Sequence, residues 1–416
     1  MRTISFVERL ELEFYDEVCD NQQQQALPWN LCQQAIALGD ADNDDSNELA
    51  VGTVSGRLLI YKGHGHTAWR TSHDKLGMIT CVTIGDVCNK KQNNVFVLSA
   101  DGWCNIFHIP PSSPEEVQAP VLSNEIYSMH RQHLSPNSKL LKLVDIDSNG
   151  GIIIAVGFSD RVVRTYRWYQ YLDGKGGELA ILNKWALTAQ IGSLSLKPTA
   201  DNTSFELVVG QPGSTYVTLF QNGHIAYNGP ESCKTHSETV SAEVVSNVHT
   251  GDGRSCFAMS TLDGSIMLMD YSGEIIYENS VDHQLFGLTK LDITGDGLEE
   301  AIVCSWDGET YIFNANKQIA KFQFDERTAA FIAGHYSVSS SNEPCLVYVT
   351  FSGRIYIYHN VMLAHVHTVS LIQEIDDSEK VKEFLRERNR TDCSREEKKK
   401  LYQWCLYGRK PKLCIE

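Results

Sequence analysis

One unit of sequence recurs along the chain, and this repetition constrains the fold more than any other feature. Its clearest copy runs from Leu291 to Phe313 and contains an acid-rich turn, an apolar stretch, an Asp307-Gly308 turn and an alternating strand. Asp closes turns with its own side chain, Gly tolerates the positive φ of a tight hairpin, and alternation places one face of a strand in a core. A single unit cannot bury its own apolar strand, so the copies must pack against one another.

The other copies follow the same order of elements. The second residue of each hairpin turn marks the period, and successive marks lie 44 to 58 residues apart. Several short strands in a period of about 40–50 residues are typical of a propeller blade. The sequence therefore predicts an all-β fold, a seven-bladed β-propeller, with its turns marked by Gly56, Gly102, Asp160, Gly213, Gly264, Gly308 and Gly353.

The two ends of the chain differ from the repeats. Residues 4–14 alternate in polarity, and we expect one strand there that closes the ring as the outer strand of the seventh blade, beside Arg354–Tyr358. From about Gln373, acidic residues precede apolar ones at helical spacing, and a capping box follows. The predicted domains are a propeller over residues 1–372 and a short, charged helical extension over residues 373–416, which either folds against the ring or docks a partner.

Composition argues against several classes of function. Asp and Glu number 52 against 36 Lys and Arg, a net charge of −16 that opposes nucleic-acid binding. The sequence has no apolar run long enough to span a membrane, and its first residues lack the apolar core of a signal peptide. The 12 cysteines contain no CxxC pair. We therefore expect a reduced, cytoplasmic protein that does not insert into membranes.

Enzymatic motifs are missing as well. The sequence contains no GxSxG, GxxxxGK[ST] or HExxH pattern, so we expect no catalytic residue. His64 and His66 have a metal-like spacing without a third ligand at a telling offset. His283 precedes an expected inner strand and should hydrogen-bond a neighbouring blade. An enzyme with its site in the central channel stays an alternative, which converging His, Asp or Glu side chains at one mouth would support.

Two of the acid-rich turns are candidate calcium sites. Ca²⁺ binds several oxygen atoms at fixed offsets in a loop that bends at glycine. Asx turns use the same residues without an ion, and resting cytosolic calcium is far below what an open loop with three carboxylates needs. We expect no metal or other cofactor, with calcium as the alternative at two sets of residues. These sets are Asp40, Asp42, Asp44 and Glu48, and Asp292, Thr294, Asp296 and Glu300.

The acid-rich turns resemble the FG-GAP repeats of integrin alpha chains. Over residues 1–372 the chain is similar to a family of integrin alpha FG-GAP repeat-containing proteins that supplies a subunit of the KICSTOR complex. The segment VDHQLFGLTKLDITGDGLEEAIVCSWDGETYI at 281–312 carries most of the resemblance, and CLVYVTFSGRIYIY at 345–358 adds to it.

This resemblance implies a non-enzymatic scaffold for protein–protein interaction. In that family, the complex lies on the lysosomal surface and helps to recruit the GATOR assembly, which stimulates GTP hydrolysis by Rag GTPases and so restrains TOR kinase signalling on amino-acid or glucose starvation. The implied partners are kaptin, a large SZT-family scaffold and a small helical subunit, and the implied location is cytoplasmic, peripheral to the lysosomal membrane. The likeness to integrin heads leaves an extracellular, calcium-dependent adhesion module as the alternative.

Overall fold

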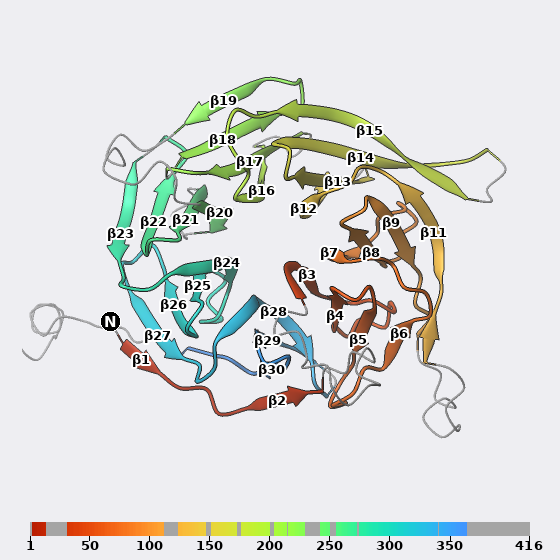
Figure 1. Cartoon of the computed structure of the whole chain (residues 1–416). Helices are drawn as coiled ribbons and strands as arrows, with labels where there is room; N and C mark the ends of the chain where they lie inside the picture. The colour runs from red at the N-terminus through yellow and green to blue at the C-terminus, as the bar shows by residue number, and fades with distance from the viewer. Residues whose placement is uncertain are drawn as a thin grey trace, which may run out of the picture. The chain divides into compact units, whose positions relative to one another are not determined.

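The described part of the chain forms seven sheets arranged in a ring, which confirms the predicted seven-bladed β-propeller (Figure 1). The chain divides into two compact units, Met1–Leu363 and Ala364–Glu416. The predicted helical extension at 373–416 lies outside the described residues. Of the residues described, none belongs to a helix that could cross a lipid bilayer. The computed structural model describes residues 2–13, 31–111, 124–146, 151–172, 176–199, 204–213, 215–228, 242–249, 255–272, 274–339 and 341–363.

Each sheet runs from an inner strand at the ring axis to an outer strand at the rim. The inner strands are β3 (Leu31–Gly39), β7 (Ile79–Gly85), β12 (Ser138–Ile146), β16 (Ser193–Pro198), β20 (Ala242–His249), β24 (Leu285–Leu291) and β28 (Thr328–Ser337). The second strands are β4 (Glu48–Thr53), β8 (Asn94–Ser99), β13 (Gly151–Phe158), β17 (Phe205–Gln211), β21 (Ser255–Thr261), β25 (Glu300–Ser305) and β29 (Asn342–Thr350).

The third strands pair antiparallel with the second strands and lead outward. They are β5 (Leu58–Tyr61), β9 (Trp103–Phe107), β14 (Val162–Gln170), β18 (Thr215–Phe220), β22 (Ser265–Asp270), β26 (Glu309–Phe313) and β30 (Ile355–Tyr358). The outer strands of the first six sheets are β6 (Arg70–Ser72), β11 (Ser128–His133), β15 (Gly177–Ala186), β19 (Ile225–Asn228), β23 (Ile275–Ser280) and β27 (Ile319–Gln323). A short strand, β10 (Glu125–Ile126), adds to β6 in parallel.

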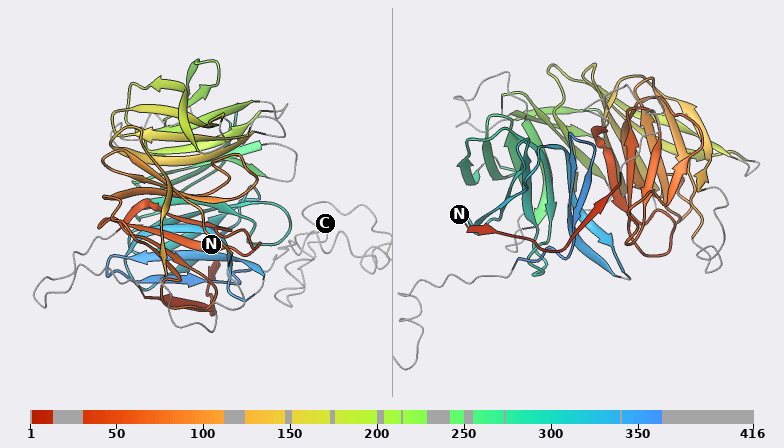
Figure 2. Two further views of the ribbon diagram at one scale, coloured as in Figure 1. Left: turned by 90° about the vertical axis from the view of Figure 1, so that its right-hand side faces the viewer. Right: turned by 60° about the horizontal axis from the view of Figure 1, so that its bottom comes forward.

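The N-terminal segment forms two strands where the sequence predicts one. The second, β2 (Arg9–Leu12), pairs antiparallel with β30 and so completes the seventh sheet. The first, β1 (Arg2–Ile4), pairs in parallel with β27 of the sixth sheet (Figure 2). Between them the Phe6 ring packs 5.0 Å from the ring of Phe322, because the chain crosses from one sheet to the next there. The N-terminus therefore joins two blades as well as closing one.

The hairpin between the second and third strands needs a positive φ, which explains the recurring glycine. Six of the marked positions are glycines with φ between 79° and 97°. In the third sheet the equivalent residue is Arg161, with φ 67°, and not Asp160 as the sequence suggests. The backbone N–H of Arg161 donates to the Phe158 carbonyl, as Gly56 donates to Thr53. The repeat mark in that blade therefore shifts by one residue.

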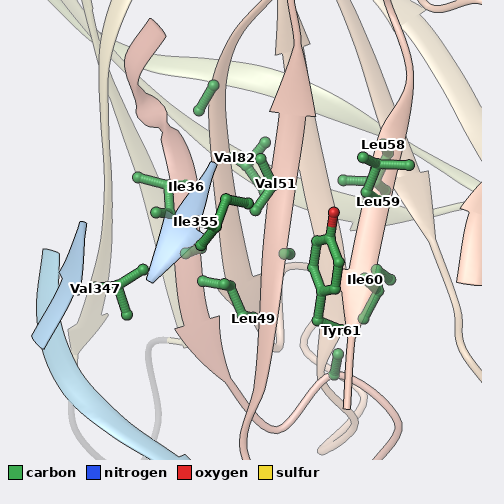
Figure 3. Packing of buried hydrophobic residues seen from close by; sticks show 14 of the residues in the cluster. Ile36, Leu49, Val51, Leu58, Leu59, Ile60, Tyr61, Val82, Val347 and Ile355 are labelled. Carbon is green, nitrogen blue, oxygen red and sulfur yellow. The ribbon is translucent and has the colours of Figure 1, made fainter. Parts of the chain in front are cut away.

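Apolar second and third strands make the core between blades. In the first sheet, β4 and β5 are buried along their whole length. Figure 3 shows Leu49 and Val51 of β4 close to Val347 and Ile355 of the seventh sheet, while Val82 of the second sheet belongs to the same cluster. A fully buried side chain of this size contributes about 1.5–3 kcal/mol, so stacking of neighbouring sheets stabilises the ring.

Candidate functional site

The acid-rich turn of the first blade joins β3 to β4. Both oxygens of Asp40 accept backbone hydrogen bonds, from Asp44 at 3.1 Å and from Asp45 at 3.0 Å. Glu48 Oε2 accepts the backbone N–H of Ala41 at 2.8 Å. These bonds close the turn from within, as expected for an Asx turn.

The ammonium group of Lys62 lies among the remaining carboxylate oxygens of this turn. Lys62 directly follows β5, and its Nζ is 2.6 Å from Asp42 Oδ2, 2.6 Å from Asp44 Oδ2 and 3.0 Å from Glu48 Oε1. The same ammonium lies 4.9 Å from the centre of the Trp69 ring. A side chain of the protein thus supplies the positive charge that a metal ion would bring to this cluster.

Burial disfavours the charged forms of two carboxylates in this cluster. Asp42 and Glu48 are both 0% exposed. Burial raises the pKa of Glu48 to about 7, despite hydrogen bonds from Ala41 and Lys62 that lower it. Burial also raises the pKa of Asp42. Burial alone would lower the pKa of Lys62, but its hydrogen bonds to the carboxylates raise it overall, so the lysine stays charged.

The same turn also bridges the blades on either side. The backbone N–H of Asn47 donates to Asn342 Oδ1 at 2.8 Å, and the Asn47 amide donates to the His335 carbonyl at 3.1 Å, both in the seventh blade. On the other side, the backbone N–H of Asn93 donates to Asn43 Oδ1 at 2.6 Å, and the Asn43 amide donates to the Asn93 carbonyl at 3.2 Å. The turn therefore fastens the first blade to the seventh and the second.

The acid-rich turn of the sixth blade closes on its own backbone. Asp292 accepts the N–H groups of Gly295 at 2.7 Å and Gly297 at 2.9 Å. Glu300 Oε2 accepts the N–H of Ile293 at 3.2 Å. Glu300 is buried, and burial raises its pKa to about 7. Every one of these contacts serves the turn itself.

The other two candidates in this turn behave in the same way. Asp296 accepts the backbone N–H two residues later at 2.9 Å, and the Thr294 hydroxyl lies 3.4 Å from a Glu300 oxygen. The residue six positions after the hairpin glycine is Lys62 in the first blade and Asn314 in the sixth. The sixth turn therefore has no lysine at the position that supplies the cation in the first.

His283 contacts its own blade, so the expectation of a neighbouring blade was wrong. Its Nδ1 is 2.7 Å from Asp307 Oδ2, and its Nε2 is 3.0 Å from Glu309 Oε2. His283 precedes β24, and both carboxylates belong to the hairpin of the same sheet, which bends back toward it. The histidine orients this hairpin.

Other histidines lie beside the N-terminal segment. His66 Nδ1 is 2.7 Å from the Glu11 carbonyl oxygen. His359 Nδ1 lies 3.4 Å from Glu8 Oε2 and 3.3 Å from Glu343 Oε2, a grouping that the sequence analysis missed because its members are far apart in the chain. These contacts help to hold the N-terminal segment against the seventh blade.

The inner strands enclose a cavity of about 780 Å³ at the centre of the ring. Polar side chains link neighbouring strands around it. The Gln33 amide donates to the Phe331 carbonyl at 3.0 Å and accepts the Phe331 N–H at 3.1 Å, which joins the first blade to the seventh. The Ser246 N–H donates to Ser195 Oγ at 2.8 Å. Side chains thus replace the missing ladder between adjacent inner strands.

The charged side chains among the described residues that line this cavity are Lys139, Lys142, Lys290 and Glu243. Glu243 accepts the Leu288 N–H at 2.7 Å, and burial raises the pKa of this carboxyl. This set differs from the converging His, Asp and Glu residues that would support an enzyme in the channel. Three of these four side chains are lysines, so the charged residues that line the cavity are mainly cationic.

Comparison with known proteins decides the family. Residues 62–229 and 222–363 match the family described as integrin-alpha FG-GAP repeat-containing protein 2. The chain belongs to this family. Within it, the KICSTOR complex protein ITFG2 of Mus musculus is 36% identical over 421 residues, covering 93% of this chain and 92% of the relative. The KICSTOR complex protein ITFG2 of Bos taurus is 36% identical over 412 residues, covering 90% of this chain and 74% of the relative.

Solved structures show how this member of the integrin-alpha FG-GAP repeat-containing protein 2 family is built. BBS1N, in its crystal structure with ARL6DN soaked with mercury, aligns with a TM-score of 0.60 at 13% identity, covering 89% of this chain and 100% of that chain. Sqt1 of Saccharomyces cerevisiae aligns with a TM-score of 0.52 at 12% identity, covering 80% of this chain and 97% of that chain. At such identities the likeness concerns the fold alone.

Proposed function

We propose that this chain is a non-enzymatic scaffold subunit of a KICSTOR-type complex. One observation carries the proposal, namely 36% identity to the mouse KICSTOR complex protein ITFG2 over 93% of this chain. The ring architecture supports it, because blades fastened to one another present loops and outer strands in fixed positions. The family assignment favours this function over an integrin-like adhesion module and over an enzyme in the channel.

The proposal extends to partners and location. The chain would bind kaptin, the large SZT-family scaffold and the small helical subunit, and through them the GATOR complex. It would be cytoplasmic and peripheral to the lysosomal membrane, where its complex restrains TOR signalling on amino-acid or glucose starvation. The support is kinship with proteins named as KICSTOR subunits.

We further propose that the acid-rich turns are structural and that the ring has no catalytic or cofactor-binding residue. Lys62 already forms ion pairs with Asp42 and Asp44 at the first turn. Asp292 is engaged by backbone N–H groups at the sixth. Both turns are therefore closed by groups of the protein itself.

Affinity purification tests the scaffold function and the proposed domain boundary together. The tagged full chain and a tagged chain of residues 1–372 would be expressed in cells and recovered from lysates, with a thermal melt of each as a control for folding. We expect kaptin and the SZT-family subunit with both, which would place the interface on the ring. Their absence from the full-chain sample would refute the proposal, whereas their loss only from residues 1–372 would move the interface to the extension.

A further inference from the structure

The central cavity has a charge opposite to that of the whole protein. The chain has a net charge of −16, yet three lysines and one glutamate line the cavity. Lys139 and Lys142 both come from β12, the inner strand of the third blade, and Lys290 comes from β24. Such a cluster of cations on the axis of an acidic protein is unexpected from the composition of the chain.

Within the described residues, two of these lysines form no close ion pair, and Glu243 acts on both only as a nearby charge. Lys290 pairs with Glu299 at 2.7 Å. Lys139 Nζ donates to the neutral Ile191 carbonyl at 2.6 Å, and in the described ranges no carboxylate lies at ion-pair distance from Lys139 or Lys142. The nearby Glu243 directs one of its oxygens to the Leu288 N–H.

Desolvation by the surrounding protein lowers the pKa of both Lys139 and Lys142 although the charge of Glu243 opposes this shift, and both side chains are exposed. The charged amines are therefore held in an environment that disfavours them. An anion in the cavity would relieve this cost.

We propose that the central cavity binds a small molecule that carries a phosphate group, with Lys139 and Lys142 as the cationic contacts. Lysine ammonium groups are common point-charge ligands of phosphate. The volume of about 780 Å³ falls within the range of small-molecule sites. Ser193 belongs to the same wall and offers a hydroxyl, while Leu194 and Leu288 offer apolar surface to the remainder of the ligand.

Calorimetric titration of the full chain at constant ionic strength tests this site, with inorganic phosphate and phenyl phosphate as probes and sulfate as the competing anion. The variant is the double substitution Lys139→Met and Lys142→Met, which keeps the apolar stems and removes both charges. Lys184→Met is the matched control, because Lys184 is exposed on the outer strand β15. We expect affinity to fall about tenfold for each lysine removed and to stay unchanged in the control.

Tighter binding of phenyl phosphate than of phosphate would assign an organic ester, and equal binding would assign the free ion. Either result supports the site if the double variant no longer binds the probe. The proposal is wrong if neither probe binds the wild-type chain at millimolar concentration, or if the double variant binds as tightly as the control. A thermal melt without ligand gives a second test, since the double variant should melt no lower than wild type once two unpaired charges are gone. A marked fall would show that the lysines stabilise the ring instead.

Discussion

Replacing Lys62 with Met removes the positive charge from the acid-rich turn of the first blade. The change would leave Asp42 and Glu48, both 0% exposed, and Asp44 facing one another without it. Breaking a buried ion pair by removing one partner costs about 3–5 kcal/mol. We expect about 2–3 kcal/mol at pH 7, because Lys62 is 21% exposed and Glu48, with a pKa of about 7, can take up a proton.

The assay is a thermal melt of wild type and variant, with and without calcium. A loss of about 2–3 kcal/mol should lower the melting temperature by roughly 5 °C in a domain of this size. Millimolar calcium should not change the melting temperature of the wild-type chain, because the Lys62 ammonium already lies among the carboxylates. The variant should regain part of its stability with calcium, since the remaining carboxylates then face a vacated cation position. Lys75→Met, an exposed lysine of the same blade, should do neither.

Two results would refute this reasoning. If calcium at up to millimolar concentration raises the melting temperature of the wild-type chain, Lys62 does not hold the cation position. If Lys62→Met has the melting temperature of wild type, the ion pairs of Lys62 with the carboxylates do not contribute to stability.

Three further changes test the turn, the ring closure and the hairpin. Burial raises the pKa of Glu300 from 4.5 to about 7, so between these pH values the folded state holds a proton that the unfolded state has lost. The free energy of unfolding should therefore fall by up to about 3 kcal/mol as pH rises through this range. Urea unfolding from pH 4.5 to 8 should show a weaker pH dependence for Glu300→Gln than for wild type, and an unchanged one for the exposed Glu274→Gln. Leu12→Ala should cost about 2–5 kcal/mol in urea unfolding, because Leu12 is 1% exposed in β2, whereas Val7→Ala at 90% exposure should cost under about 0.5 kcal/mol. Equal costs would mean that β2 does not complete the seventh sheet. Arg161→Gly should raise the melting temperature, with a gain of up to about 1 kcal/mol, because Arg161 has φ 67°; a lower melting temperature would show that its side-chain contacts outweigh the strain.

The blade count could be predicted because its signals are local. A glycine in a hairpin turn and the apolar run before it lie within a few residues, and each of the six hairpin glycines that mark the blades has a positive φ. The exception shows the same rule. In the third blade Arg161 adopts that conformation, and without a glycine the sequence offers no local mark, so the turn was placed one residue early.

The candidate site could be predicted only in part, because its decisive contacts join distant residues. The carboxylates of the first turn were identified from their offsets, but Lys62 reaches them from the far end of the next hairpin. Its signal was present in the sequence as a lysine six residues after Gly56, where the sixth copy has Asn314. Such a substitution between repeats gains meaning only once the geometry shows that this position faces the acid-rich turn.

The ring is closed by contacts between the first and last blades as well as by the N-terminal segment. At the rim, β2 pairs with β30. At the inner strands, Gln33 makes two hydrogen bonds to the backbone of Phe331. At the acid-rich turn, Asn47 binds Asn342 and the backbone of the seventh blade. Because opening the ring must break all three together, closure is cooperative, and the loops that would meet partner subunits keep fixed spacings around the ring.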